Sequence, residues 1–278
     1  MTYQLLQGDC VDALASLPVE SVDAVVTSPP YAMQRKSTYG GVPEKEYPDW
    51  TVSWMCALKP ALKDTGSVII NIRPHIKNGQ ISDYVLRTRL ALRDAGWCEL
   101  EELIWHKKGG APLGSTRRPR RSWESLLWFG KQGSAYAAPK AAGLDSVRIG
   151  LSGGRQGDHI GSKQFNANGS KVVGTARVSD VVEMSTRLNA NSDGLNDHPA
   201  PFPWQLAEWC GKLVCPPGGT ILDPFMGSAS TGVAALRNGW HFIGIDAVEE
   251  YVEMSRRRLE AEQSHTAPDL FDVAKEAA

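Results

Sequence analysis

Two short segments of this chain combine residue types that could carry chemistry. The segment at 223–232 reads Asp-Pro-Phe-Met-Gly-Ser-Ala-Ser-Thr-Gly and lies between an expected strand and an expected helix. Small residues there let the backbone approach a ligand at a helix amino terminus, and Asp246, at the end of the next expected strand, could accept hydrogen bonds from both hydroxyls of a ribose. A Gly-rich turn alone is equally typical of a structural turn. The acid at the later strand end favours a nucleoside-binding site.

The second segment, Thr27-Ser-Pro-Pro-Tyr31, directly follows an expected buried strand. The Ser28 side chain and the Pro29 carbonyl could accept both hydrogens of a planar amino group, which frees the nitrogen lone pair to attack a methyl donor. Two successive prolines fix the direction of that carbonyl, and Tyr31 offers a flat face on which an extruded base can stack. The alternative is a plain loop whose tyrosine packs on the core, and the nucleoside motif makes that alternative weaker.

Regular elements on either side position both motifs. The apolar periodicity predicts strands that alternate with helices, which is the arrangement of a parallel α/β sheet. The expected strands are 3–7, 22–27, 66–72, 100–105, 124–130, 220–222 and 241–245, and the expected helices are 11–16, 50–58, 81–95, 203–215, 230–238 and 249–260. Both motifs therefore fall where a strand ends, and the polar loop at 34–48 could close over a substrate.

A basic stretch interrupts this pattern. Between Lys107 and Arg177 there are 13 Lys and Arg residues against 3 acids, although the net charge of the whole chain is −1. Gly, Ser and Asn are frequent at 131–186, and regular periodicity is lost there. A basic insert on an otherwise acidic body favours one face that binds a polyanion. A solvated loop is the alternative.

Length and composition restrict the class of protein. A chain of 278 residues with 42% hydrophobic residues fits one globular domain with an insertion. No apolar run approaches the roughly 20 residues of a membrane helix, and the amino terminus resembles no secretory signal, so we expect a cytoplasmic protein without a membrane partner. Five cysteines without a CxxC pair and six scattered histidines predict neither disulfides nor a metal site.

These motifs and their neighbours resemble the amino-methyltransferase family of DNA-modifying enzymes along nearly the whole chain. The segment SPPY at 28–31 matches the family's [DNS]PP[YFW] catalytic motif, and DPFMGSASTG at 223–232 is similar to its DPFxGSGTT cofactor motif. The pieces Gly8-Asp9, TGSVIINI, RSWESLLWFGK and HPAPFP at 198–203 also occur in the family's order. Because the catalytic motif precedes the cofactor motif, the arrangement resembles the β, or circularly permuted, class.

The resemblance implies an α/β protein with a Rossmann-like, S-adenosylmethionine-dependent methyltransferase fold, circularly permuted, with an inserted target-recognition region. It divides the chain into a catalytic half at 1–130, a recognition insert at 131–190, a cofactor-binding half at 191–262 and a flexible tail at 263–278. The implied catalytic residues are Ser28, Pro29, Pro30 and Tyr31. The implied cofactor-binding residues are Asp9, Cys10, His198, Pro201, Phe202, Pro203, Asp223, Pro224, Phe225, Gly227, Ser228, Thr231 and Asp246.

The implied reaction moves a methyl group from S-adenosylmethionine to the exocyclic amino group of a base flipped out of double-stranded DNA. Serine at the first catalytic position is commoner in relatives that act on cytosine N4, but adenine N6 stays open. A restriction-modification role and a solitary role are not distinguished. The resemblance also implies a homodimer, because members of this class often pair. The candidate DNA contacts, each of which also fits a solvated charge, are Arg117, Arg118, Arg120, Arg121, Arg148, Arg155, Lys163, Lys171 and Arg177.

Two other functions compete with this interpretation. Protein-glutamine methyltransferases use a similar Asn-Pro-Pro-Tyr loop, but their cofactor motif comes first and the basic insert would have no purpose. The other alternative is a non-catalytic DNA-binding protein on the same scaffold. Ala229, where relatives usually carry Gly, lends it slight support because alanine disfavours positive φ. The intact catalytic motif and Asp246 count against it.

Overall fold

The structure is a computed structural model that describes residues 1–33, 41–108, 117–142, 145–148, 172–175, 177–185 and 202–266; for 145–148, 172–175, 265 and 266 it gives the backbone alone. The predicted loop at 34–48 is thus described from residue 41 onward, and about half of the predicted insert lies outside the described residues.

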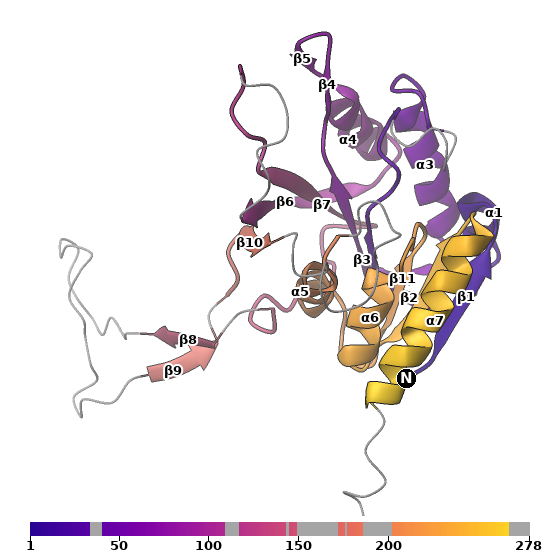
Figure 1. Cartoon of the computed structure of the whole chain (residues 1–278), viewed down its shortest axis with the longest axis vertical. Coiled ribbons are helices and arrows are strands. Elements are labelled where there is room, and N and C mark those ends of the chain that lie inside the picture. The colour runs from indigo at the N-terminus through magenta and orange to yellow at the C-terminus, as the bar shows by residue number, and fades with distance from the viewer. Residues whose placement is uncertain are drawn as a thin grey trace, which may run out of the picture.

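One large sheet forms the centre of the described chain (Figure 1). It has eight strands in the order β1-β12-β11-β2-β3-β7-β6-β10, and β7 alone among them pairs antiparallel to its neighbours. The strands are β1 Tyr3–Gln7, β2 Val22–Thr27, β3 Leu62–Ile72, β6 Cys98–Lys108, β7 Trp123–Gly130, β10 Val181–Ser185, β11 Thr220–Asp223 and β12 His241–Asp246.

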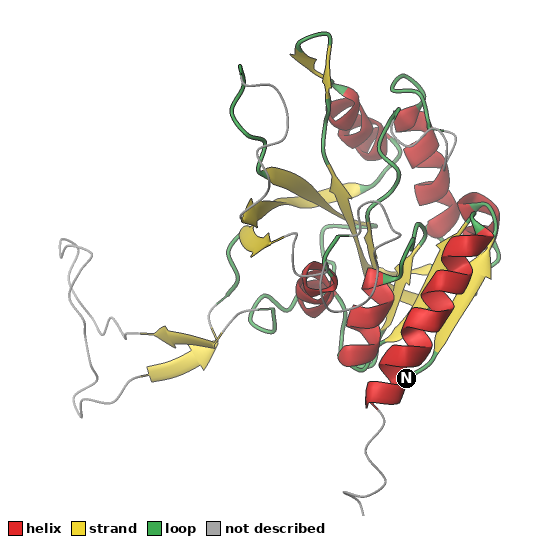
Figure 2. Cartoon of the chain, in the orientation of Figure 1, coloured by secondary structure: helices red, strands yellow, loops and turns green. Residues whose placement is uncertain are grey.

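Helices cover both faces of this sheet (Figure 2). They are α1 Cys10–Ala15, α3 Tyr47–Leu58, α4 Tyr84–Asp94, α5 Trp204–Val214, α6 Ser230–Arg237 and α7 Glu249–Thr266. The strands supply two cores: Ala24 and Val26 of β2 lie in the core with α5 and α6, while Val22 and Val25 lie in the core with α1, α3 and α4. A strand buried on both faces explains why 22–26 is apolar at four of its five positions rather than alternating; the exception, Asp23, is buried and pairs with Lys63.

The strand order reverses at the centre of the sheet. From β11 the chain passes through α6 to β12 on one side, whereas β2 leads through α3 to β3 on the other. In an open parallel sheet, ligands bind beyond the carboxyl ends of the strands at such a switch point. Residues at the ends of β2 and β11 are therefore placed to meet the same ligand.

The predicted α/β architecture is confirmed, and the differences are local. The helix expected at 81–95 begins instead at Tyr84, because Ile81 belongs to a small antiparallel pair, β4 Ile76–Lys77 with β5 Gln80–Ile81. β3 begins four residues earlier than expected, at Leu62. The predicted tail at 263–278 starts as helix, since α7 runs to Thr266.

The range expected to form the recognition insert contributes to two sheets. β10 pairs in parallel with β6 and extends the main sheet, while β8 Asp145–Arg148 and β9 Val172–Thr175 form a separate antiparallel pair. The main sheet can accept β10 because Val182 fits the apolar core beside α5. Periodicity did not reveal β10, because its residues lie in a polar stretch where no clear apolar pattern stands out.

Candidate active site

The end of β2 and the end of β11 are joined by side chains. Thr27 Oγ1 donates a hydrogen bond of 2.6 Å to Asp223 Oδ1, which also accepts the backbone N–H of Phe225 at 3.1 Å. The Thr231 hydroxyl lies 2.9 Å from Asp223 Oδ2 and 3.1 Å from the Val26 carbonyl oxygen. This buried cluster fixes the start of the catalytic motif against the start of the cofactor motif, although the two are 196 residues apart.

Burial raises the pKa of the Asp223 carboxyl to about 6, and the hydrogen bonds from Thr27, Thr231 and Phe225 oppose part of that shift. Desolvation disfavours the charged form of a carboxyl group, which is the dominant effect here. The donors to the Asp223 carboxyl described above all belong to the protein. This side chain therefore holds the two motif segments together.

A second carboxylate, that of Asp246 at the end of β12, holds the cofactor loop. Its Oδ2 accepts the Gly227 N–H at 3.0 Å and its Oδ1 accepts the Val248 N–H at 2.9 Å. Asp246 is 2% exposed, and desolvation is the largest cause that raises its pKa. The Ala247 N–H also interacts with this carboxylate. Because a carboxylate offers about four acceptor sites, these contacts still leave some acceptor capacity at the strand end.

Helix α7 supports the same loop from behind. Ser255 Oγ donates to the Gly227 carbonyl at 2.7 Å, and Arg258 donates to the Ser228 carbonyl at 2.7 Å. Sequence reasoning missed both residues, because nothing in an amphipathic helix singles out two polar positions on its inner face. Ala229 follows with φ 55° and ψ 42°, so the strained left-handed conformation suspected from the sequence is present.

The early Gly-Asp pair lies beside this loop. The Gly8 N–H donates to the Asp246 carbonyl at 3.0 Å, and the space where a Gly8 side chain would stand is open. Asp9 caps α1 by accepting the Val11 N–H at 2.8 Å. Cys10 is buried, and burial is the main cause that raises the pKa of its thiol to about 12. A ligand can therefore approach the backbone at Gly8, whereas Cys10 has no reactive thiolate.

Aromatic rings pack around the remaining cofactor-motif residues. Phe225 lies 5.4 Å from the Trp50 ring and 5.5 Å from the Trp54 ring, measured between ring centroids. Pro224 is buried. Phe202 packs partly buried against the α5 side of the core, and Pro203 begins α5 as its amino-terminal cap. His198 and Pro201 lie outside the described residues.

The catalytic motif meets a polar cluster that the sequence did not reveal. Tyr31 Oη donates to Glu124 Oε2 at 2.9 Å, and the Asn71 amide donates to the same oxygen at 3.0 Å. The Asn71 amide nitrogen also lies 3.4 Å from both Ser28 Oγ and Tyr31 Oη. Burial and the Glu124 carboxylate raise the pKa of the Tyr31 phenol well above its usual range. The phenol therefore stays protonated and donates.

Two cations face the other oxygen of the Glu124 carboxylate. Lys107 Nζ pairs with Glu124 Oε1, and Arg73 Nη1 lies 4.0 Å from it. Lys107 also stands over the Trp105 ring, 4.5 Å from its centroid. Asn71 is at the end of β3, Glu124 at the start of β7 and Lys107 at the end of β6. Because β7 runs antiparallel, all three reach the same edge of the sheet as Ser28.

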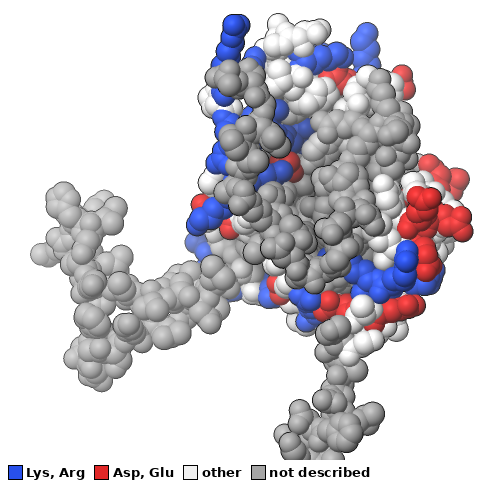
Figure 3. Space-filling model, viewed as in Figure 1, with Lys and Arg blue, Asp and Glu red and all other residues white. Residues whose placement is uncertain are grey.

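Basic side chains surround this edge. Arg117, Arg118 and Arg120 are exposed and Arg121 is half-buried, and Arg118 donates to the Gly79 carbonyl of the β4–β5 turn. Figure 3 shows Lys and Arg along the side of the molecule that carries β4 to β7, whereas Asp and Glu gather near the start of α7. Arg177 is also exposed. Among the other predicted DNA contacts, Arg148 is described by its backbone alone, and Arg155, Lys163 and Lys171 lie outside the described residues.

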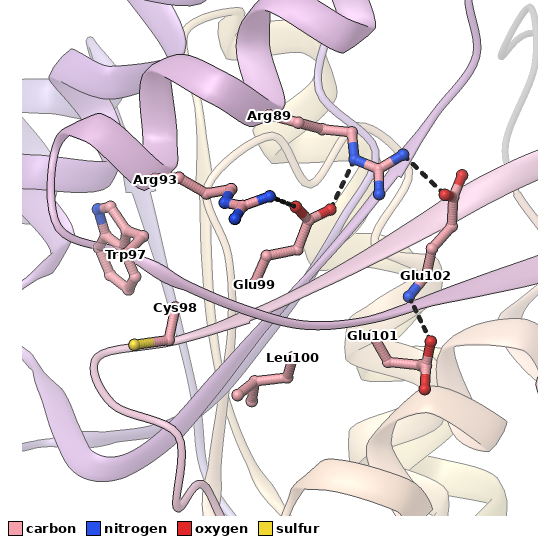
Figure 4. Close-up of a pocket in the computed structure, with 8 residues that line it drawn as sticks. All are labelled: Arg89, Arg93, Trp97, Cys98, Glu99, Leu100, Glu101 and Glu102. Carbon is pink, nitrogen blue, oxygen red and sulfur yellow. Dashed lines mark hydrogen bonds and ion pairs between the residues drawn. The ribbon is translucent and has the colours of Figure 1, made fainter.

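A pocket of about 650 Å³ opens elsewhere, between the end of α4 and the start of β6 (Figure 4). Its charged residues satisfy one another: Arg89 pairs with Glu99 and with Glu102, at 2.6 and 2.7 Å, and Arg93 lies 3.9 Å from Glu99. β6 runs parallel to β3, so the start of β6 lies at the amino ends of these strands, whereas Ser28 lies at the carboxyl ends. This pocket is separate from the motif residues.

Metal ligands and membrane spans are both absent from the described part of the chain. No group of three or more His, Cys, Asp and Glu residues there could hold a metal ion. No helix within the described ranges is long and apolar enough to cross a membrane.

A parallel sheet with helices on both faces, an acid-anchored loop at its switch point and an adjacent Ser-Pro-Pro-Tyr loop define a nucleoside-dependent group-transfer enzyme. Residues 22–257 match the DNA methylase family of N6 and N4 methyltransferases. Because this match spans most of the chain, the chain belongs to the DNA methylase family. It is an S-adenosylmethionine-dependent DNA amino-methyltransferase, as the motifs predicted.

Individual relatives agree with this assignment. The type II methyltransferase M.PvuII of Proteus hauseri is 27% identical over 275 residues, which cover 91% of this chain and 82% of that protein. The type II methyltransferase M.ScaI of Streptomyces caespitosus is 28% identical over 263 residues, 93% of this chain and 81% of that protein.

Solved structures share the fold. PvuII DNA methyltransferase, described as cytosine-N4-specific, superposes with a TM-score of 0.71 at 24% identity over 95% of this chain and 91% of that one. A putative DNA modification methylase from Thermus thermophilus, complexed with S-adenosyl-L-methionine, superposes with a TM-score of 0.61 at 21% identity over 94% of this chain and 96% of that one.

Proposed function

We propose that this enzyme methylates the N4 amino group of a cytosine flipped out of duplex DNA, at a specific sequence. The observation that carries the proposal is the Thr27–Asp223 hydrogen bond of 2.6 Å, which holds the Ser-Pro-Pro-Tyr loop directly beside the cofactor loop. The neutral Ser28 and the likeness to a methyltransferase described as cytosine-N4-specific support cytosine over adenine.

The catalytic loop has one task, which is to hold a planar amine with its lone pair aimed at the methyl group. We assign Ser28 Oγ and the Pro29 carbonyl as acceptors of the two amine hydrogens, and the two prolines fix the direction of that carbonyl. Tyr31 provides the stacking face for the flipped base. Bound S-adenosylmethionine supplies an electrophilic methyl group on a good leaving group. On transfer the nitrogen–methyl bond would form as the sulfur–methyl bond breaks, S-adenosylhomocysteine would leave and one amine proton would pass to solvent water, so orientation supplies most of the rate.

The residues around β11 and β12 fit the cofactor. Asp246 has free acceptor capacity at the strand end for ribose hydroxyls, and the open space at Gly8 lies beside it. Phe225, Gly227 and Ser228 form the loop at the start of α6. Asp223 and Thr231 were also predicted to bind the cofactor. Their side chains hydrogen-bond within the protein, so their role is to shape this loop.

The basic edge around Arg118 and Arg120 is the proposed duplex-DNA surface, because it borders the catalytic loop and phosphate neutralisation requires cations there. Arg73 and Lys107 lie deeper, against Glu124. The remaining candidate contacts, Arg117, Arg121, Arg148, Arg155, Lys163, Lys171 and Arg177, stay predictions from the sequence.

The first test is to incubate the enzyme with S-adenosylmethionine and unmethylated DNA, digest the DNA to nucleosides and identify the product by mass spectrometry. N4-methylcytosine is the expected product. N6-methyladenine would overturn the choice of base but not the reaction. Absence of both, with the cofactor bound in calorimetry, would overturn the assignment to DNA.

Tyr31→Ala then tests the stacking role. It should lower kcat on the order of 100-fold, since a poorly oriented base reacts slowly. Its Kd for S-adenosylmethionine, measured by calorimetry, should match that of the unaltered enzyme. Unchanged turnover on duplex DNA would show that Tyr31 does not hold the base.

We further propose a cytoplasmic protein that forms a homodimer. Leu86 and Leu90 lie one turn apart on α4 and are 61% and 59% exposed, which offers an apolar contact for a second copy. Light scattering after size exclusion checks the mass. If Leu86→Glu leaves a dimer intact, the dimer forms elsewhere, and a monomer at working concentration overturns the proposal.

A further inference from the structure

Glu124 is the centre of the polar cluster beneath the catalytic loop, and four donors surround its carboxylate. Oε2 accepts the Tyr31 hydroxyl and the Asn71 amide, at 2.9 and 3.0 Å. Oε1 faces the cations Lys107 and Arg73. Glu124 is 6% exposed, so water cannot replace a lost partner easily. A buried carboxylate with donors on both sides is held by them and in turn fixes where each donor points.

We propose that Glu124 is a positioning residue for methyl transfer, acting through Tyr31 and Asn71. The hydrogen bond from the Tyr31 hydroxyl to Glu124 fixes the orientation of the Tyr31 ring, whose face must lie against the base. The Asn71 bond sets the orientation of its amide, because an acceptor-only carboxylate requires the amide nitrogen to face it. That nitrogen then lies 3.4 Å from Ser28 Oγ and from Tyr31 Oη. The first and last residues of the loop are thus aligned by one carboxylate.

This role rests on the proposed function of the loop, and it explains why a carboxylate rather than an amide occupies the position. In Glu124→Gln, one end of the side chain becomes an NH2 group. If that group faces Lys107 and Arg73, two cations lose their acceptor. If it faces Tyr31 and Asn71, two donors meet a third. Either rotamer disturbs the alignment of the donors around the side chain, although its volume is unchanged.

If Glu124 positions the loop, its replacement should change the rate of methyl transfer but not the affinity for the cofactor. Glu124→Gln should lower the single-turnover rate of methyl transfer to DNA by a factor on the order of 10 to 100, the usual effect of a small misplacement of a reacting group. The Kd for S-adenosylmethionine should change less than about twofold, because Asp246 and its loop lie on the other side of β2. The matched control is Glu102→Gln on β6, whose partners are Arg89 and Ser125, and it should keep the rate.

A double-mutant cycle distinguishes positioning from general loosening. Tyr31→Phe keeps the stacking face and removes the hydroxyl. If Glu124 acts in part through that hydroxyl, the rate loss of Glu124→Gln should be clearly smaller in the Tyr31→Phe background than in the unaltered enzyme. A full, additive loss in that background, or an equal loss of cofactor affinity, would overturn the proposal.

Glu124→Asp covers the case in which Glu124→Gln does not fold. It keeps the charge beside Lys107 and Arg73 but withdraws the carboxylate by one methylene from Tyr31. A folded Glu124→Asp enzyme with an unaltered rate would also refute the role. Product identity is read in the same assay, so methylation of adenine would correct the proposed base while leaving the rate ratio of Glu124→Gln interpretable. If unaltered enzyme methylates no nucleic acid base, both proposals fail.

Discussion

Replacing Asp223 by Asn should leave the protein as stable as before or more stable at neutral pH, although the aspartate is buried at the centre of the site. The asparagine oxygen can accept from Thr27 and from the Phe225 N–H, as Oδ1 does now. Its NH2 group can donate to the Thr231 hydroxyl, which is then free to donate to the Val26 carbonyl. With the charged aspartate, one Thr231 hydrogen must serve two acceptors. With the neutral asparagine side chain, every donor in this cluster has its own acceptor.

The magnitude follows from the raised pKa of Asp223, about 6 against an ordinary value of 3.8. The folded state therefore binds the proton more tightly than the unfolded state. Stability from this group is fully present below about pH 4 and is lost as pH rises towards and through 6. At 1.36 kcal/mol per pKa unit, the charged form costs at most about 3 kcal/mol at pH 8. Asp223→Asn removes that cost and the part of the pH dependence that comes from it.

Urea unfolding at pH 5 and pH 8 measures this difference. The free energy of unfolding of Asp223→Asn should exceed that of the unaltered protein by more at pH 8 than at pH 5, with the same m-value. Asp223→Ala, which leaves the Thr27 hydroxyl and the Phe225 N–H without an acceptor, should be destabilised by about 2 kcal/mol or more at both pH values. If Asp223→Asn lost as much stability at pH 8 as Asp223→Ala, the carboxylate charge would be required by the fold and the reasoning would be wrong.

Three further changes have defined outcomes. In thermal unfolding, the stability of Ala229→Gly should stay within about 1 kcal/mol of that of the unaltered protein, because relief of left-handed strain offsets the lost methyl group. Ala235→Gly inside α6 should lose about 2 kcal/mol of stability. Equal losses in the two variants would contradict the strain at Ala229. Asp246→Ala should raise the Kd for S-adenosylmethionine more than tenfold in calorimetry, and unchanged affinity would remove it from the cofactor site. Neutralising Arg118 and Arg120 together should reduce the slope of log Kd for DNA against log salt by about 2, and an unchanged slope would exclude both as phosphate contacts.

The elements of the fold were predictable where the chain is strongly patterned. The segment Val22 to Val26, apolar at four of its five positions, predicted a buried strand. The helix after Asp223 follows from small residues and a regular apolar face. The short strand at 181–185 was not predictable, because its place beside β6 depends on the shape of a core edge rather than on its own sequence. The start of α4 was misplaced for a related reason: Ile81 fits the helical pattern, but its pairing with Ile76 decides its conformation.

The site divides in the same way. Ser28, Tyr31 and Asp246 carry recognisable chemistry at recognisable positions, so motifs identify them. Glu124 and Asn71 carry no motif, since a single acid in RSWESLL and a single amide in IINI each fit a strand with a polar residue. Their meeting depends on β7 being inserted antiparallel between β3 and β6. Only the three-dimensional pairing of strands far apart in sequence brings them to Tyr31.

That pairing also explains how a site can be built from two distant parts of the chain. β2 and β11 share only two register pairs, Ile221 with Ala24 and Leu222 with Val25, so their carboxyl ends are free to separate beyond them. Such separation at a switch point opens the space that a ligand fills. The Thr27–Asp223 hydrogen bond joins the ends of the two strands again, through side chains rather than through the backbone. The two motif loops are therefore held side by side by one threonine and one carboxyl group, whichever of the two strands comes first in the sequence.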